Sequence, residues 1–530
     1  MRQRKFWGWG FADEGASEAE VGMLAGLAAQ RFGVDSLGVV PPPAPEEISL
    51  GRPRVQVPAS LAGIVTADHH ARLVHALGRS FPDQVKPFLR DFTTAPDLVA
   101  FPRDEADIAA LMDWAGAQDV ALIPFGGGSS VVGGVTPPGD RAALSLDMGR
   151  LDRIREIDRT SRAALIEGGM FGPALEAGLK PHGLTLRHFP QSFEFSTLGG
   201  WIVTRSGGHY ATGPTHIEEF VEAVTLVTPA GRIETRRLPA SGAGPDTNRW
   251  VAGSEGAFGI LASAWMRLQD IPKQRLGTSI AFDGFHRGAE AIREIVQAGF
   301  QPANCRLIDA GEALATFAGD GSADLLVLGF ESAGAPLDAL MAGALEICRA
   351  HGGRFAPPKA SSTGGQREGA AGAWRNAFLR APYYREVLVA RGVMVDTFET
   401  AITWDRFDDF VDTVKARVRD AILRVTGRPG QVTCRLTHVY ADGAAPYFTF
   451  YGLGRGDLAD LIGQWQVVKQ AASDALIELG GTITHHHAVG RDHAAHYARE
   501  VPGLAVAALQ AVKRRLDPKG IMNPGVLLPG

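Results

Sequence analysis

The sequence predicts an α+β fold, built from a two-part α/β domain and an α+β domain that follows it. A strand–helix–strand unit spans residues 98–124, and three glycine-rich clusters lie next to strands between residues 124 and 259. The composition then shifts near Ile271, and helices alternate with strands to about residue 500. These observations divide the chain into residues 1–90, 91–270, 271–500 and a C-terminal tail, 501–530, which we expect to return to the α/β domain.

The elements of the first 270 residues follow from their apolar spacing. Helical periodicity predicts helices over Glu18–Phe32 and Asp104–Gln118, and the proline-rich residues 41–45 are typical of a linker. Short apolar runs predict strands. They are Leu98–Pro102, Ala121–Pro124, Leu144–Asp147, Ala164–Gly168 and Val221–Thr228.

The α+β domain shows both periodicities in turn. Helices are predicted over His286–Ala298, Leu337–His351 and Arg406–Arg424, with a strand over Leu325–Phe330. The glycines of residues 365–372 predict a mobile link between elements.

Two further strands, Gln431–Tyr440 and Pro446–Tyr451, are expected to form a hairpin. Because side chains alternate along a strand, we expect one face of the first strand to differ from the other. One face carries Thr433, Arg435 and Thr437, and the other carries Cys434, Leu436 and His438. The second strand places Tyr447, Thr449 and Tyr451 on one face.

Composition excludes several classes of protein. The 530 residues carry 53 Lys and Arg against 58 Asp and Glu, a net charge of −5, which argues against a nucleic-acid partner. The three cysteines are far apart, which excludes a disulfide framework and a cysteine-rich metal site, and we predict no metal. No apolar run reaches the roughly 18 residues of a spanning helix, and no secretory signal is apparent. We therefore expect a cytoplasmic protein.

The glycine-rich clusters predict a phosphate-binding site. Glycine allows positive φ and a close approach of backbone to ligand, so successive N–H groups can point into one concavity. Any one cluster could be an ordinary tight turn, but three of them lie in one predicted domain. Val131 stands where the G-x-G-x-x-G fingerprint needs its last glycine, and no Gly-Lys-Ser/Thr follows. A dinucleotide held by another architecture is the better interpretation.

These clusters resemble the FAD-binding domain of the vanillyl-alcohol oxidase superfamily and, within it, the alkyldihydroxyacetonephosphate synthase family. The resemblance rests on 123–131, 190–201 and 253–259, and in the C-terminal half on 398–406, 433–437 and 480–490. It implies a two-part FAD-binding domain, an α+β cap domain for the substrate, and FAD held non-covalently. The cofactor-binding residues that it implies are Pro124, Phe125, Gly126, Gly127, Gly128, Ser129, Ser130, Pro190, Gln191, Ser192, Ser196, Thr197, Gly199, Thr204, Arg205, Ser206, Gly207, Gly253, Ser254, Glu255, Gly256 and Gly259.

The resemblance also assigns chemistry to the cap domain. It implies Tyr447 as the acid–base residue, Arg385 as the ligand of a substrate phosphate, and Arg306 as an arginine near the reaction. The three consecutive histidines, His485, His486 and His487, would orient the substrate. Taken alone, Tyr447 could be a core aromatic and Arg385 a surface arginine. The histidines could form a solvated loop, or a metal site that recruits Asp492, His493 or His496.

Three functions remain open at this stage. The family implies an FAD-dependent, redox-neutral transferase, which exchanges the acyl chain of an acyl-dihydroxyacetone phosphate for a long-chain alcohol. An FAD-dependent dehydrogenase or oxidase of a 2-hydroxy acid such as D-lactate or glycolate is the alternative, and a non-catalytic flavoprotein is the third. A lipid-like small-molecule substrate makes peripheral membrane contact an expectation, and a homodimer stays open.

Overall fold

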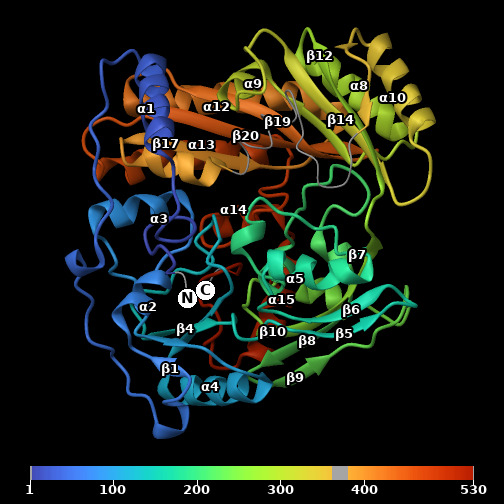
Figure 1. The fold of residues 1–530 in the computed structure, drawn as a ribbon. Coiled ribbons are helices and arrows are strands. Elements are labelled where there is room, and N and C mark those ends of the chain that lie inside the picture. Colours follow the sequence, from blue (N-terminus) through green and yellow to red (C-terminus); the bar gives the residue numbers. More distant parts are fainter. Residues whose placement is uncertain (1–2, 361–379, 529–530) are drawn as a thin grey trace.

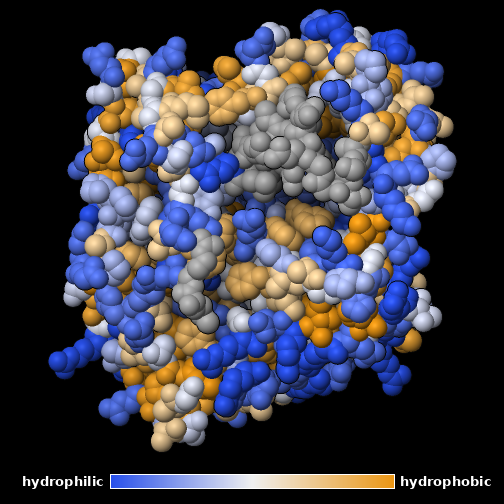
Figure 2. Space-filling model, in the orientation of Figure 1, coloured by the Kyte–Doolittle hydropathy of each residue, from blue (hydrophilic) through white to orange (hydrophobic). Residues whose placement is uncertain are grey.

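The computed structural model describes residues 3–360 and 380–528, and the predicted link at 365–372 lies outside them. Two smaller sheets with their helices form the lower part of the molecule in Figure 1, and a nine-stranded sheet with its helices forms the upper part. Hydrophilic and hydrophobic residues interleave over the same face in Figure 2. Within the described residues, no helix is long and apolar enough to cross a membrane.

The first sheet has four strands in the order β1-β2-β4-β3, and β4 pairs in parallel with both β2 and β3. The crossover helix α4 joins β2 to β3, as expected for a strand–helix–strand unit. The elements are β1 (Val65–Thr66), α2 (His69–Val74), α3 (Phe81–Val85), β2 (Leu98–Ala100), α4 (Glu105–Gln118), β3 (Ala121–Phe125) and β4 (Ala143–Asp147).

The second sheet is antiparallel, in the order β5-β6-β10-β8-β9. Strands β7 and β11 form a separate two-stranded sheet. Its strands are β5 (Ile154–Asp158), β6 (Ala163–Glu167), β7 (Leu184–Thr185), β8 (Val221–Thr228), β9 (Gly231–Glu234), β10 (Ile260–Arg267) and β11 (Gln269–Asp270). Its helices are α5 (Gly172–Leu179), α6 (Leu198–Thr204) and α7 (Thr247–Val251).

The nine-stranded sheet runs β15-β12-β14-β13-β19-β20-β17, with β16 on β12 and β18 on β20. Its strands are β12 (Gln274–Phe282), β13 (Asn304–Ile308), β14 (Asp324–Ser332), β15 (Arg354–Phe355), β16 (Lys359–Ala360), β17 (Val393–Glu399), β18 (Ile402–Thr403), β19 (Gln431–Val439) and β20 (Gly443–Leu453). Its helices are α8 (Phe285–Gln297), α9 (Ala310–Ala315), α10 (Asp338–Ala350), α12 (Phe407–Thr426) and α13 (Asp460–Glu478).

The predicted elements are present, with ends shifted by a few residues at most sites. Helix α1 spans Glu18–Phe32 as predicted, because Ser17 and Glu20 form a capping box and Gly33 ends the helix in the left-handed region. The hairpin of β19 and β20 also forms. A helical stretch, residues 380–389, carries Arg385.

The C-terminal end packs onto the first sheet, and the N-terminal end packs against helix α2. Near the C-terminus, α14 (Ala494–Glu500) and α15 (Gly503–Leu516) precede Ile521 and Met522, which are buried in the apolar cluster of β2, β3 and β4. Near the N-terminus, Phe6 is buried against Leu73 and Phe92. These contacts bring residues from both ends of the sequence to the same part of the molecule.

Candidate functional site

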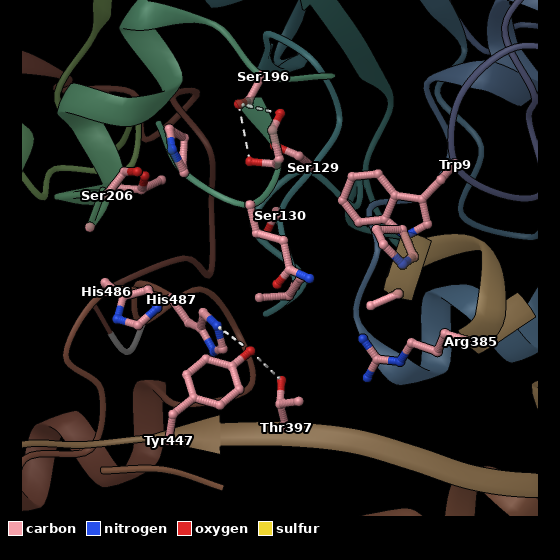
Figure 3. A pocket seen from close by; sticks show the side chains of 18 of the residues that line it. Trp9, Ser129, Ser130, Ser196, Ser206, Arg385, Thr397, Tyr447, His486 and His487 are labelled. Atoms are coloured by element: carbon pink, nitrogen blue, oxygen red, sulfur yellow. Dashed lines mark hydrogen bonds between the residues drawn. The ribbon is translucent and has the colours of Figure 1, made fainter. Parts of the chain in front are cut away.

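A main cavity of about 910 Å³ is lined by most of the site residues that the sequence analysis predicts. Figure 3 shows Ser129 and Ser196 at one end of it, with Tyr447 and His487 at the other. The nominated residues in its wall are Pro124, Phe125, Gly126, Gly127, Gly128, Ser129, Ser130, Pro190, Gln191, Ser192, Ser196, Thr197, Gly199, Thr204, Ser206, Gly207, Glu255, Gly256, Gly259, Arg306, Arg385, Tyr447, His486 and His487. The nominated residues outside this wall are Arg205, Gly253, Ser254 and His485, which line a second cavity.

The first glycine cluster leaves no room for side chains. A Cβ at Gly127 would lie 1.6 Å from the carbonyl oxygen of Phe195, and Gly128 has a φ of +69°. Ser130 holds the loop through its hydroxyl, which accepts the N–H of Gly134 at 2.8 Å. Among the described residues, the N–H groups of Gly127 and Gly128 meet no hydrogen-bond acceptor. A row of free N–H groups fits a pyrophosphate, as FAD requires.

The second cluster begins helix α6 at the cavity wall. The Thr197 hydroxyl caps the helix by accepting the N–H of Gly200 at 3.4 Å. The Ser196 hydroxyl accepts the Trp201 indole N–H at 2.6 Å. A Cβ at Gly199 would lie 2.8 Å from the carbonyl oxygen of Gly168, so helix and strand can pack closely here only because the residue is glycine.

Glu255 joins the third cluster to the residues that follow the histidine loop, which we define as His485–His487. Its carboxylate accepts the N–H of Val489 at 2.9 Å and that of Gly490 at 2.8 Å. Burial raises the pKa of Glu255 to about 7, although these two N–H groups oppose the shift.

Tyr447 sits at the centre of the polar end of the cavity, on β20. Its hydroxyl donates to Thr397 at 3.1 Å and lies 3.3 Å from Nε2 of His487. The Arg435 guanidinium lies 3.8 Å from the centre of the Tyr447 ring and is paired with Glu312. Burial raises the pKa of Tyr447, and the charge of Arg435 opposes that shift. The phenol is therefore protonated near neutral pH and can donate a proton.

The histidine loop is held by a carboxylate that the sequence did not single out. Glu399, at the end of β17, is buried and accepts the N–H groups of His485, His486 and His487 at 2.6, 3.1 and 3.0 Å. Three adjacent N–H groups converge on one charge, which fixes the loop backbone.

The loop imidazoles are neutral bases. Burial lowers the pKa of His486 and His487 to about 3, and the pKa of His485 lies well below its usual value for the same reason. Nearby imidazoles add to the effect for His485 and His486. At neutral pH each ring therefore has one nitrogen that can accept a proton.

The predicted orientation of His438 is wrong. The pairing of β19 with β20 shifts in register between Leu436 and His438, so regular alternation is lost there. Thr437 and His438 both line the main cavity, and the His438 ring lies 4.9 Å from that of His485. A bulge in a strand pairing has no signal in the period-2 pattern that predicted the strand.

Arg385 and Arg306 approach the cavity from different elements. Arg385 donates from Nε to the carbonyl oxygen of Val395 at 2.8 Å, and its guanidinium is paired with Asp396. The Asp396 carboxylate also accepts the Trp465 indole N–H at 2.7 Å. Arg306, on β13, is buried and lies 3.4 Å from the carbonyl oxygen of His209 through Nη2. Both cations face the cavity from fixed positions.

The alternative metal site does not include the residues considered for it. Among the described residues, ligand atoms of His438, His485 and His486 lie within 4.8 Å of one another, without Asp492, His493 or His496. Both nitrogens of His438 and of His485 are engaged in hydrogen bonds, such as His438 Nε2 to the carbonyl oxygen of Gly208 at 2.9 Å.

The far wall of the cavity is apolar and comes from elements remote in sequence. It is lined by α1, by α9 and the residues just after it, and by the stretch 380–389. The apolar residues involved are Leu24, Leu27, Ala28, Leu314, Ala315, Phe317 and Leu388. Leu27, Leu314 and Phe317 are 44%, 52% and 45% exposed, so this wall continues to the surface. Trp9, from the N-terminal segment, also lines the cavity (Figure 3).

Comparisons with known proteins agree with this architecture. Residues 96–236 match the model of the "FAD binding domain" family, and residues 271–527 match "FAD linked oxidases, C-terminal domain". Alkyldihydroxyacetonephosphate synthase of Trypanosoma brucei brucei is 30% identical over 494 residues, covering 88% of this chain and 78% of that protein. The enzyme of the same name from Caenorhabditis elegans is 31% identical over 482 residues, covering 86% and 80%. A solved structure of alkyldihydroxyacetonephosphate synthase has a TM-score of 0.81 at 24% identity, covering 98% of this chain and 97% of its own.

Proposed function

The chain belongs to the alkyldihydroxyacetonephosphate synthase family and is an FAD-dependent enzyme of that type, and we propose that it makes an ether lipid precursor. In this reaction the acyl chain of an acyl-dihydroxyacetone phosphate is exchanged for a long-chain alcohol. The fatty acid leaves, and the alcohol oxygen forms the ether bond, with no net oxidation of the substrate.

One observation carries the proposal: a single cavity joins an anion-binding loop, a cluster of acid–base groups and an apolar wall. Its volume of about 910 Å³ is large enough for a cofactor together with part of a chain-bearing substrate. A small 2-hydroxy acid would leave the wall of Leu24, Leu314 and Leu388 without an apolar partner. A lipid chain would instead remove this wall from water.

The side chains of the cavity suit the exchange. Bound FAD would supply a group that can hold and return an electron pair, and this chain's residues would bind the substrate and move protons. Arg385 would bind the substrate phosphate through the part of its guanidinium that Asp396 leaves available, with Arg306 as a second cation. Tyr447 would donate its proton to the leaving carboxylate, and His487, 3.3 Å away, would take part in returning it.

FAD would be held without a covalent bond. Gly126–Ser130 would bind the pyrophosphate, and residues 190–207 with Gly256 and Gly259 would line the flavin. Cys305, Cys348 and Cys434 are buried elsewhere and are not part of the cavity wall. Acid precipitation of the purified yellow protein should release the flavin into the supernatant, and flavin that stays in the pellet would contradict this assignment.

The domain assignment follows the same division. Residues 91–270 would hold FAD, 271–500 would form the substrate cap, and 501–530 would return to the FAD domain. The exposed Leu27, Leu314 and Phe317 at the cavity mouth would contact a membrane surface, where both substrates partition.

The test is an anaerobic assay without dye. Purified holoenzyme is incubated with acyl-dihydroxyacetone phosphate labelled in the acyl chain and with hexadecanol. We expect one fatty acid released for each ether formed, with no acceptor consumed. Dye reduction by D-lactate or glycolate, without ether formation, would overturn the proposal in favour of a hydroxy-acid dehydrogenase.

A further inference from the structure

A second cavity, of about 580 Å³, lies behind the histidine loop. His486 lines both cavities, whereas His485 and His216 line only the second. Arg205 and Arg249 also line it, and their side chains are 58% and 55% exposed. The second cavity therefore reaches solvent on a route separate from the apolar mouth of the main cavity.

A continuous chain of hydrogen bonds leads from His486 to the second cavity. His486 Nδ1 lies 3.1 Å from His485 Nδ1, and His485 Nε2 lies 2.8 Å from the Tyr440 hydroxyl. That hydroxyl lies 3.0 Å from the Thr215 hydroxyl, which lies 3.1 Å from His216 Nδ1. The chain ends where His216 Nε2 meets the carbonyl oxygen of His485 at 2.7 Å.

The last contact fixes the direction of all the others. A carbonyl oxygen can only accept, so His216 carries its proton on Nε2 and accepts the Thr215 hydroxyl at Nδ1. Thr215 must then accept from Tyr440, and Tyr440 must accept from Nε2 of His485. His485 in turn accepts at Nδ1, so His486 carries its proton on Nδ1. The Nε2 atom of His486 is left as the basic nitrogen.

The Glu399 carboxylate lies close to the other end of this chain. His486 Nδ1 lies 3.4 Å from Oε2 of Glu399 as well as 3.1 Å from Nδ1 of His485. This contact is an ion-pair distance without a hydrogen bond, and the negative oxygen favours a proton on the nearby Nδ1. The tautomer of His486 thus follows from the chain of hydrogen bonds, and the position of Glu399 is compatible with it.

We propose that His486 is the general base of the main cavity, and that His485, Tyr440, Thr215 and His216 relay its proton to the second cavity. The relay rests on the proposed function for the origin of its proton. An ester and an alcohol become an ether, a carboxylate and one proton. The alcohol proton restores Tyr447, and the fatty acid that Tyr447 has protonated gives its proton to His486 and leaves as the carboxylate, so each turnover must release one proton to water. The main cavity is a poor route for it, because a lipid chain would fill the apolar wall.

Each relay member accepts one proton and passes on another. His486 takes the proton at Nε2 and gives its Nδ1 proton to His485, which gives its Nε2 proton to Tyr440. Tyr440 gives its hydroxyl proton to Thr215, and Thr215 gives its own to His216 at Nδ1. His216, which is only partly buried, then releases its Nε2 proton to water in the second cavity once the contact of Nε2 with the His485 carbonyl oxygen opens, and the starting tautomers are restored before the next turnover. His486, whose pKa burial lowers to about 3, does not retain the charge.

The decisive experiment removes the His216 imidazole, at the end of the relay, and supplies free imidazole in solution in its place. His216→Ala should lower turnover in the acyl-exchange assay by roughly 10- to 100-fold, and added imidazole should restore it with saturation. The second cavity has room for imidazole beside the truncated side chain. Tyr440→Phe breaks the relay at its middle, so imidazole should not rescue it. Tyr497→Phe removes a phenol from the same cavity outside the relay and is the matched control.

The outcomes separate the relay from the proposed function. Nitrogen-15 spectra of the histidine-labelled holoenzyme, assigned with single His variants, should show His216 protonated on Nε2 and His486 on Nδ1. A proton on Nε2 of His486, or full activity of His216→Ala without imidazole, would overturn the relay even if the exchange takes place. If the wild-type enzyme forms no ether, the proposed function fails. The nitrogen-15 spectra then still show whether His216 and His486 have the tautomers that the relay requires.

Discussion

The two ends of the main cavity are built by different means. The anion-binding end uses backbone, because Gly127 and Gly128 expose N–H groups and exclude side chains. The polar end uses side chains from several strands, and it depends on contacts such as those of Glu399 with the histidine loop. The residues of the anion-binding end are therefore close together in sequence, whereas those of the polar end come together only when the nine-stranded sheet has formed.

The largest expected effect comes from breaking the backbone end. In Gly127→Ala, the new Cβ would lie 1.6 Å from the carbonyl oxygen of Phe195, so the loop must move. We expect the purified protein to lose its bound FAD, with an affinity at least about 100-fold weaker by fluorescence titration. Gly463→Ala, in helix α13 with nothing within 4 Å of the new Cβ, is the control and should retain FAD. Normal FAD binding by Gly127→Ala would remove this loop from the cofactor site.

A smaller but still large effect comes from the side-chain end. Tyr447→Phe removes the hydroxyl that meets Thr397 and His487 and keeps the ring over Arg435. Turnover should fall by about 10²- to 10⁴-fold, while FAD stays bound and the protein stays folded. Tyr451→Phe, four residues farther along the same strand and on the same face, should cost far less. If the two variants retain equal activity, Tyr447 is a packing residue.

The same contrast explains what the sequence could predict. Helix α1 was predicted to the residue because its capping box and terminal glycine are local signals. The glycine clusters were visible for the same reason. The partners of the polar end were not, since Arg435 meets Glu312 across 123 residues and Thr484 meets Glu399 across 85.

Two further features lacked a signal of any kind. The bulge that turns His438 toward the cavity is a property of strand pairing, which the alternation of one strand does not contain. Trp9 lines the cavity from a segment that was predicted only as a helical and linker region. The stretch 398–406 was noted by resemblance, but the role of Glu399 in holding the histidine loop became visible only in three dimensions.

An intermediate effect tests Arg385, the cation proposed to bind the substrate phosphate. Arg385→Lys keeps the positive charge but loses the planar guanidinium, which can donate two parallel hydrogen bonds to a phosphate. The ammonium has fewer N–H donors, and these must also serve the Asp396 carboxylate and the Val395 carbonyl oxygen. We expect kcat/KM for the phosphate-bearing substrate to fall by about 10- to 100-fold. Arg417→Lys, in an exposed pair with Glu478, is the control. An unchanged kcat/KM would exclude Arg385 from the phosphate site.

The smallest effect probes the joint between the two ends, where Glu255 of the glycine cluster binds the N–H groups of Val489 and Gly490. The pKa of Glu255 is about 7 in the folded protein against 4.5 for the free group, so the unfolded chain ionises first as pH rises. Ionisation of the buried carboxyl then costs stability that grows between pH 4.5 and 7, on the order of 2–3 kcal/mol at the upper end. Glu255→Gln resembles the protonated acid and does not ionise. Its stability relative to wild type should therefore rise with pH, as measured by urea unfolding at pH 5 and pH 8. A constant difference between the two proteins at both pH values would show that Glu255 does not titrate in this range, and that the joint is an ordinary pair of hydrogen bonds to a charged carboxylate.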